Sequence, residues 1–519
     1  MAIRIRPLTS SLRSERSGRL QFDDRNLSMF IYSLASPMNK VGESCLKYTN
    51  SNGNLKKEIL RLNLPGESAI PVLQNWVDNG RKITVSELRY ISGILAKSRR
   101  YNHALEIFRW MDTRNNFHMS AADHAVKLEL IMKVHGLREA EEYFKLLPNS
   151  ATRKAASFPL LHGYVKERDT VKAEALMKNL NDLGLIVSSH PFNEMMKLYM
   201  ATSQYEKVLF VIQQMKHNKI PLTILSYNLW MNSCGEVSKV TDAEMVYREM
   251  VNNKNVEVGW STLSTLANIY IKAGLVDKAF LALENAERKL STNDHLGYFF
   301  LITQHASLKN KEGVRRLWKA SKGVGGRISC ANYMCILSCF VKVGDLIEAE
   351  RVFMEWESNC RNYDIRVSNV LLGAYVRNGL INKAESLHLR TLERGGCPNF
   401  KTWEILMEGW VQSQKMDKAI IAVKQAFSML NHCKWRPSHG ILVAIAEYLE
   451  KNRNFEDANH YVQDIHHLGL ASLPLYKILL RMHLHAGKAA SDILQMMEKD
   501  KIEMDNETSS LVQALYSCV

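Results

Sequence analysis

A small residue returns every 35 residues in the middle of this chain, and this period constrains the fold more than any other feature. The positions are Ala279, Val314, Ala349, Ala384 and Ala419. Nine residues before each of them the chain carries a ring, at Tyr270, His305, Phe340, Tyr375 and Trp410. A period of this length indicates a solenoid, whose units bury their apolar faces only against their neighbours. We therefore expect function along an extended surface.

One unit, residues 365–399, shows why the repeat predicts a pair of helices. Apolar residues recur at helical spacing from Val367 to Tyr375, and Gly379 interrupts the pattern. A second amphipathic stretch follows, in which the small Ala384 allows two helices to approach closely. The predicted fold is all-α: a right-handed superhelical solenoid of about twelve helix-turn-helix repeats.

Short motifs within the repeats carry a family resemblance. They are Tyr227 with Asn228, Phe192 with Asn193, IYIKAGLVDKA at 269–279, FVKVGDLIEAERVF at 340–353, and the closing Met215 and Met250. They resemble the pentatricopeptide repeat family, with its Tyr-Asn start, Lys-x-Gly turn and Ala-x-x-x-Phe second helix. The Trp and Leu-Gly of tetratricopeptide repeats do not recur. The resemblance covers most of the chain and is to the P-type members of plant mitochondria, a group that includes ribosome-associated proteins.

The ends of the chain differ from the repeats. Residues 1–22 hold five arginines, Glu15 is their only acid, and no apolar run there is long enough for a secretory signal. We predict a transit peptide and linker over 1–63, a capping helix over 64–84, repeats over 85–505 and a second capping helix over 506–519. The arginines favour the mitochondrion, with the plastid as the alternative; a basic arm that is not cleaved remains open.

Composition favours a polyanionic partner and gives no sign of an enzyme. The 519 residues include 68 basic and 53 acidic ones, a net charge of +15, which attracts nucleic acid. Cysteines and histidines lack the spacing of a metal site. No apolar stretch approaches the length of a membrane span. We expect no catalysis, cofactor, metal, membrane span or small-molecule substrate.

The resemblance implies RNA binding, in which the fifth and last residues of a repeat read one unstacked base. Carried over by register, the pairs are Asn193 with Thr223, Ser264 with Asp294, and Asn369 with Asn399; Asn228 also holds a reading position. The other explanation is that these residues cap helices or form exposed polar surface.

Elsewhere the fifth position departs from the amide or small-hydroxyl type. It holds Arg89, Ala125, Phe158, Phe299, Met334, Glu404, Val443 and Lys477. A long contiguous code is therefore not expected. The prediction is a non-catalytic organellar protein that binds single-stranded or ribosomal RNA. It would act in mitochondrial RNA processing, stability or translation, or as a ribosome-associated component that contacts mitochondrial ribosomal proteins. The alternative, favoured by Phe299 and Met334, is a protein-interaction scaffold without RNA.

Overall fold

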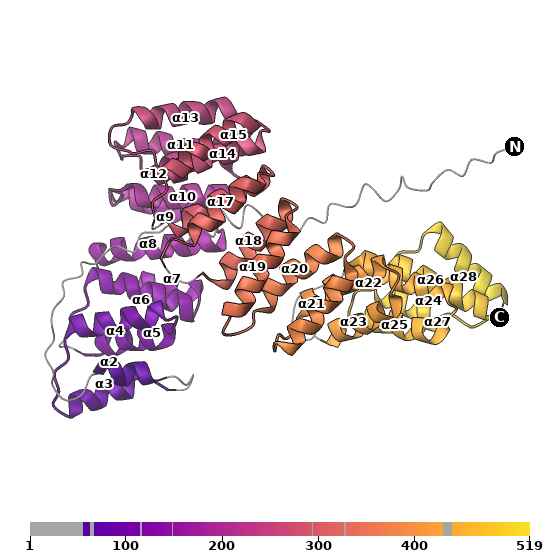
Figure 1. Cartoon of the computed structure of the whole chain (residues 1–519). Coiled ribbons are helices and arrows are strands. Elements are labelled where there is room, and N and C mark those ends of the chain that lie inside the picture. Colours follow the sequence, from indigo (N-terminus) through magenta and orange to yellow (C-terminus); the bar gives the residue numbers. More distant parts are fainter. Residues whose placement is uncertain are drawn as a thin grey trace. The chain divides into compact units, whose positions relative to one another are not determined.

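All the regular secondary structure that the structure describes is helical (Figure 1). The computed structural model describes residues 55–62, 67–114, 117–147, 149–292, 294–325, 328–428 and 438–518. The helices are labelled α2 to α28, and no strand occurs in these ranges. The predicted all-helical repeat fold is confirmed, while the predicted transit segment lies outside the described residues.

The chain divides into two compact units, which meet in the sequence between Leu275 and Val276. The helices of the first unit are α2 (Leu55–Arg61), α3 (Ala69–Asp78), α4 (Val85–Lys97), α5 (Tyr101–Asp112), α6 (Ala121–Val134), α7 (Leu137–Lys145), α8 (Ser150–Glu167), α9 (Thr170–Asp182), α10 (Ser189–Ala201), α11 (Tyr205–His217), α12 (Ile224–Glu236), α13 (Val240–Asn252) and α14 (Trp260–Lys272).

The second unit continues with the same alternation of helices. They are α15 (Val276–Arg288), α16 (His295–Ser307), α17 (Lys311–Ser321), α18 (Cys330–Lys342), α19 (Leu346–Asn359), α20 (Ile365–Arg377), α21 (Ile381–Glu393), α22 (Phe400–Gln412), α23 (Met416–Ser428), α24 (His439–Lys451), α25 (Phe455–His467), α26 (Leu473–Ala486), α27 (Ser491–Lys499) and α28 (Asn506–Cys518).

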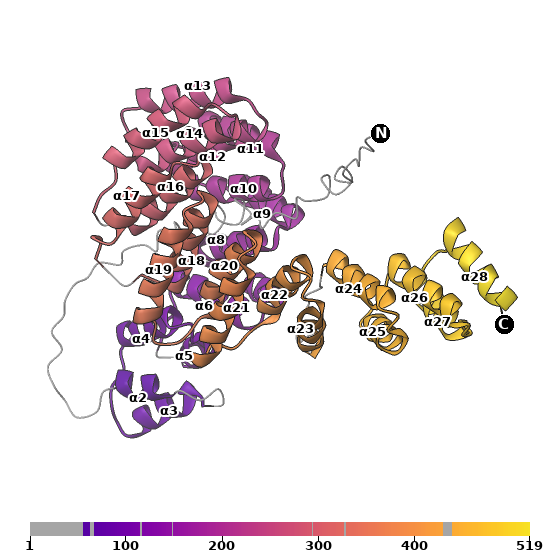
Figure 2. The same ribbon diagram turned by 45° about the vertical axis from the view of Figure 1, so that its right-hand side comes forward.

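Within each unit the helices form consecutive pairs. The first helix of a pair packs on its own second helix and on the first helix of the next pair, as α20 packs on α21 and α22. Figure 2 shows the same relation among α10, α12 and α14 in the first unit. The first helices therefore form one continuous layer from α6 to α14 in the first unit and from α16 to α28 in the second, and the second helices pack against it.

The turn between the helices of a pair is short and has left-handed backbone. Helix α20 ends at Arg377, Gly379 has a φ of 70°, and α21 begins at Ile381. Glycine adopts this conformation without steric cost, which explains why it recurs at this point of the repeat.

The five recurring small residues, from Ala279 to Ala419, are fully buried. Each lies near the start of a second helix, where it faces the first helix of its pair. Because a longer side chain would hold the two helices apart, the 35-residue period records a packing requirement.

Four of the five recurring rings, all except Phe340, form a hydrogen bond with a glutamate on the second helix of the preceding pair. The Tyr375 hydroxyl donates to Glu350 Oε1 (2.9 Å), and Lys383 Nζ donates to the same oxygen (2.8 Å). Glu350 lies on α19, the second helix of the preceding pair, so one carboxylate joins three consecutive helices.

The same link recurs in both units. Its other members are Tyr199 with Glu174 and Lys207, Trp410 with Glu385 and Lys418, and His305 with Glu287 and Arg316. Burial alone would raise the pKa of Glu385, but hydrogen bonds from Lys418, Trp410 and Lys415 lower it to about 2. The Glu385 carboxylate is therefore charged at physiological pH.

The predicted linker is too long at its C-terminal end. Helix α2 lies inside it, with Leu55 and Ile59 buried, and the Arg100 guanidinium donates to the carbonyl oxygens of Leu60 (3.0 Å) and Ile59 (3.3 Å). An arginine that binds the free carbonyls of a helix end stabilises that helix. The capping roles assigned to residues 64–84 and 506–519, where α3 and α28 lie, stay predictions.

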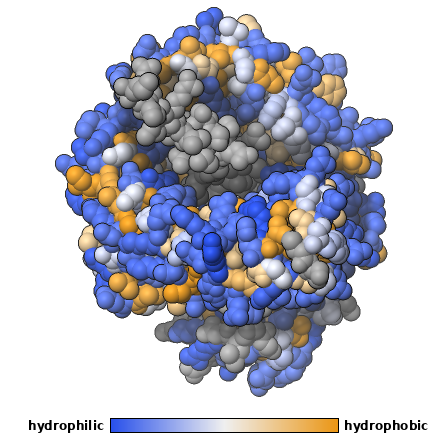
Figure 3. All heavy atoms as spheres, turned by 90° about the vertical axis from the view of Figure 1, so that its right-hand side faces the viewer, coloured by the Kyte–Doolittle hydropathy of each residue, from blue (hydrophilic) through white to orange (hydrophobic). Residues whose placement is uncertain are grey.

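The face drawn in Figure 3 is mostly hydrophilic, with small scattered hydrophobic groups. None of the described helices is long and apolar enough to cross a membrane.

Ala384→Leu should lower the free energy of unfolding by about 1–3 kcal/mol, because the added carbons have no space at a fully buried position. Urea unfolding of the full chain, followed by circular dichroism, measures the change. Ser386→Leu on the exposed face of the same helix is the control and should leave the unfolding midpoint nearly unchanged. Equal midpoints for both variants would contradict the packing argument.

Candidate nucleic-acid interface

The predicted reading residues occupy two kinds of position. Fifth residues of first helices are Asn193 on α10, Asn228 on α12, Ser264 on α14 and Asn369 on α20. Residues that cap the N-terminus of a first helix are Thr223 before α12, Asp294 before α16 and Asn399 before α22. The four fifth residues are buried, between 1 and 8% exposed. They are thus held within the first-helix layer.

Asn193 and Thr223 meet as predicted. Asn193 Nδ2 donates to Thr223 Oγ1 (3.3 Å), and Asn193 Oδ1 accepts from the hydroxyl of Ser226 (2.8 Å). Ser226 is the third residue of α12 and is fully buried. Both polar atoms of the Asn193 carboxamide therefore have protein partners.

Asn369 and Asn399 form the same arrangement in the second unit. Asn369 Nδ2 donates to Asn399 Oδ1 (3.2 Å), and Asn369 Oδ1 accepts from the hydroxyl of Thr402 (2.9 Å). Thr402 is the third residue of α22. We call this set a cap triangle: the fifth residue of one first helix, together with the N-cap and third residues of the next first helix.

The N-cap residues also hold their helices. Thr223 Oγ1 accepts from the backbone N–H of Ser226 (3.3 Å), and Asn399 Oδ1 accepts from the backbone N–H of Thr402 (3.1 Å). Each forms a reciprocal capping box with its third residue. Helix capping and contact with the fifth residue are therefore properties of the same side chains.

Two fifth residues that depart from the expected type lie in charged cap triangles. Arg89 donates to both carboxylate oxygens of Asp123 (2.8 and 2.6 Å), the third residue of α6. Lys477 donates to Asp505 (2.6 Å), which precedes α28 and accepts from the Thr508 hydroxyl (2.7 Å). Burial would raise the pKa of Asp123, but hydrogen bonds from Arg89 and Ser120 lower it. These cations are neutralised within the fold.

Asn228 lies in an incomplete cap triangle. Its N-cap partner is Gly259, which has no side chain, and the third residue of α14 is Thr262. Within the described structure, Asn228 Oδ1 and Thr262 Oγ1 are buried and have no hydrogen-bond partner. A buried acceptor without a donor is costly, so this position is the one that a ligand could complete.

The third predicted pair is divided between the two units. Ser264 is in the first unit and is almost fully buried, and Asp294 is in the second. Asp294 accepts from the hydroxyl of Ser291 (2.9 Å) and makes no side-chain hydrogen bond to its helix.

Other fifth residues that are not of the amide or small-hydroxyl type contact side chains within the fold. Phe299 packs edge-on against Trp318 at 6.3 Å between ring centroids, and Glu404 pairs with Lys401 (2.6 Å). Helix α8 begins at Ser150, so Phe158 is not its fifth residue as the register had placed it. The register failed there because the preceding helix, α7, has only 9 residues.

The acid next to Asn193 is also neutralised. Glu194 is buried and pairs with Lys197 (2.7 Å) and His162 (3.1 Å). Burial would raise its pKa, but these two partners lower it to about 2. In the part of the chain that is described, no three His, Cys, Asp or Glu side chains gather as metal ligands would.

Sequence reasoning missed the third residues of the cap triangles, Ser226 and Thr402. Their signal was a Ser or Thr three residues after a capping residue, which is the spacing of a capping box. Because both lie in first helices that follow a reading asparagine, that spacing could have been matched to the asparagine in the repeat before.

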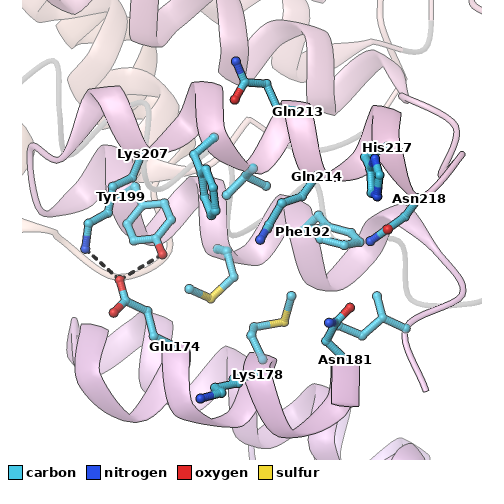
Figure 4. A pocket seen from close by; sticks show the side chains of 15 residues that line it. Glu174, Lys178, Asn181, Phe192, Tyr199, Lys207, Gln213, Gln214, His217 and Asn218 are labelled. Carbon is cyan, nitrogen blue, oxygen red and sulfur yellow. Dashed lines mark hydrogen bonds and ion pairs between the residues drawn. The ribbon is translucent and has the colours of Figure 1, made fainter. Parts of the chain in front are cut away.

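A groove of about 810 Å³ lies in the first unit, between helices α9, α10 and α11 (Figure 4). Its lining includes the apolar Phe192 and Met195, and four exposed carboxamides: Asn181, Gln213, Gln214 and Asn218. The link of Glu174 with Tyr199 and Lys207 closes one end. None of the predicted reading residues lines this groove.

The fold and the cap triangles define a solenoid of helical-hairpin repeats, and comparison with known proteins identifies its family. The family model of the pentatricopeptide repeat domain matches residues 175–237, and the repeat model matches 225–255, 332–360 and 367–396. A pentatricopeptide repeat-containing protein of Arabidopsis thaliana is 59% identical over 87% of this chain and 93% of its own length. The chain belongs to the pentatricopeptide repeat family.

Two further similarities are more distant. A mitochondrial pentatricopeptide repeat-containing protein of A. thaliana is 30% identical over 91% of this chain and 96% of its own length. The crystal structure of the pentatricopeptide repeat protein PPR10 in complex with an 18-nt psaJ RNA element has a TM-score of 0.54. That match has 16% identity and covers 86% of this chain and 68% of PPR10, so it shows the shared fold.

Arg89→Ala should destabilise the first unit by about 1 kcal/mol, because the buried Asp123 loses its partner while Arg89 itself is partly exposed. Since the Asp123 pKa is lowered in the folded chain, its stabilising effect exists above the unfolded value of 3.8. It is lost as the pH falls through the folded value, so the difference between variant and wild type should shrink in acid. Thermal unfolding at several pH values tests this.

The double variant Arg89→Ala/Asp123→Asn is the control. It removes the carboxylate as well as the cation, and it should recover part of the loss at neutral pH. A penalty that is independent of pH and unchanged in the double variant would contradict the ion-pair explanation.

Proposed function

We propose that the protein is a non-catalytic, organellar RNA-binding protein. The observation that carries the proposal is that two pairs of predicted reading residues, Asn193 with Thr223 and Asn369 with Asn399, lie within hydrogen-bond distance of each other. A carboxamide nitrogen has two protons and each triangle uses one of them, so the second can donate to a base edge. Paired side chains on successive repeats suit an unstacked single strand.

Charge and the known relatives support the same partner. The net charge of +15 attracts the phosphate backbone, and PPR10 shares the fold and is known in complex with RNA. The proposed reading set is Asn193, Thr223, Asn228, Ser264, Asp294, Asn369 and Asn399. Because charged pairs occupy the triangles of Arg89 and Lys477, the proposed protein reads a few separated bases and grips the rest by phosphate and shape.

The proposed place of action is the mitochondrion, because several relatives are named as mitochondrial. There it would act in RNA processing, stability or translation, or as a component associated with the mitochondrial ribosome. A protein with a small number of reading positions is better suited to a structured ribosomal RNA than to a long single strand. This favours the ribosome-associated form of the proposal. Its partners would then include mitochondrial ribosomal proteins.

The groove between α9 and α11 favours a second candidate function, a protein-interaction scaffold. An apolar floor with a polar rim is the usual form of a site for an amphipathic helix. Phe210, at the groove, is 58% exposed, and such a ring gains free energy when a partner covers it.

Asn369→Ala should weaken binding to a preferred RNA by about 1–3 kcal/mol, because it removes one specific contact. The measurement is selection from a randomised single-stranded RNA pool, followed by titration of the best RNA. Asn382→Ala, an exposed asparagine on the second helix of the same repeat, is the matched control. If both variants bind like the wild type, Asn369 leaves the reading set.

A photo-crosslinking amino acid placed at two positions separates the two candidate functions. In organelle extract, a probe at Lys401, which neighbours the Asn369 triangle, should crosslink RNA, and the yield should fall steeply with salt as counterions are released. A probe at Gln214 reports on the groove. Protein crosslinks at Gln214 that survive ribonuclease, with no RNA at Lys401, would favour the scaffold.

A further inference from the structure

We propose that Thr402 and Asn399 fix the orientation of the Asn369 carboxamide, so that this repeat discriminates bases more sharply than the Asn193 and Asn228 repeats. Thr402 is then a positioning residue for recognition, because it acts through Asn369. The inference rests on the proposed RNA binding, and it assigns a role in specificity to Thr402, which lies outside the predicted reading set.

The orientation at Asn369 is anchored on the backbone. A carboxamide can rotate by half a turn and exchange its donor and acceptor ends. The N–H of Thr402 cannot rotate, and it requires an oxygen at its partner, so Asn399 Oδ1 faces it (3.1 Å). That oxygen in turn requires a donor from Asn369, which places Nδ2 towards Asn399 (3.2 Å).

The Thr402 hydroxyl completes the arrangement. It donates to Asn369 Oδ1 (2.9 Å) and accepts from the backbone N–H of Asn399 (3.2 Å). A rotated Asn369 would set its oxygen against Asn399 Oδ1, and two acceptors repel. The pair can therefore present its N–H groups only at one fixed place, which selects for a base edge with an acceptor atom at that place.

The Asn193 triangle lacks this restriction. Its two partners are hydroxyls, on Thr223 and Ser226, which lie 3.0 Å apart, and either can donate or accept. If the carboxamide rotates, Thr223 can donate to the oxygen and Ser226 can accept from the nitrogen. Both orientations are satisfied, so this repeat offers either a donor or an acceptor.

The Asn228 triangle restricts its asparagine least. Gly259 supplies no side chain, and the oxygen atoms of Asn228 and Thr262 have no partner in the described structure. The expected order of base discrimination is therefore Asn369, then Asn193, then Asn228.

The test is sequencing of RNA selected from a randomised single-stranded pool by the full chain. Each reading residue is assigned to a base position by the preference that its alanine variant loses. Thr402→Val should reduce the base preference at the Asn369 position by about fivefold or more, with a smaller effect on overall affinity. Thr402→Ser keeps the hydroxyl and should keep the preference.

Thr152→Val is the matched control for helix capping. Thr152 forms a capping box with Asn149, and its hydroxyl donates back to Asn149 rather than to a reading asparagine. The fifth residue of the preceding first helix, α6, is Ala125. This variant should leave all base preferences unchanged.

Circular dichroism shows whether Thr402→Val folds. If it does not, two further variants keep the test valid. Asn399→Ser retains a capping side chain, but its hydroxyl can both donate and accept a hydrogen bond. Both orientations of the Asn369 carboxamide are then allowed, so the variant should broaden the base preference at the Asn369 position. Gly259→Asn adds the missing corner where a Cβ meets nothing within 4 Å, and it should sharpen the preference at the Asn228 position.

The outcomes separate the two levels of the proposal. If the wild type retains no RNA from the pool, the proposed RNA function fails. If it retains RNA but enriches no sequence, base reading is overturned, and the positioning role with it. If the wild type enriches a motif that Asn399→Ser and folded Thr402→Val leave as sharp as before, RNA binding stands and the positioning role is overturned.

Discussion

A single carboxylate that accepts hydrogen bonds from the next two helices, and so joins three consecutive helices, holds neighbouring repeats together. Glu350 accepts from Tyr375 on the next first helix and from Lys383 on the next second helix, and Glu174 and Glu385 do the same in their repeats. The apolar contacts set how close the helices come. The directional hydrogen bonds add a constraint on the rotation of each pair on the next.

The cap triangles connect this stacking to the proposed recognition of RNA. Each joins the fifth residue of one repeat to the start of the next, so each proposed reading site depends on two neighbouring repeats. In the Arg89 and Lys477 repeats the triangle holds an ion pair, and its hydrogen-bonding capacity is used within the fold. In the Asn193 and Asn369 repeats the partners are neutral, and a proton of the carboxamide remains for a ligand.

Much of the fold could be predicted from the sequence, because its determinants are periodic. The 35-residue return of small residues and rings predicted helix pairs. The reading positions of the family that the sequence resembles, carried over by register, paired Asn193 with Thr223 and Asn369 with Asn399. What failed depended on the identity of a distant partner. Nothing local shows that Tyr375 meets Glu350, that Arg89 meets Asp123, or that Arg100 binds the end of α2. The third residues were missed because a capping box is complete within its own helix.

The shared use of Asn399 in capping and in the proposed reading of RNA would limit how the chain changes its RNA preference. This residue must satisfy a backbone N–H of α22, and only a small set of side chains can do so: Asn, Asp, Ser and Thr, with Gly as a weaker substitute. A substitution at this position must therefore preserve the stability of the helix before it can change the proposed RNA preference. Under the proposed recognition, the residue types available at the last position of a repeat are therefore those that can cap a helix. New base preferences would arise among these residue types.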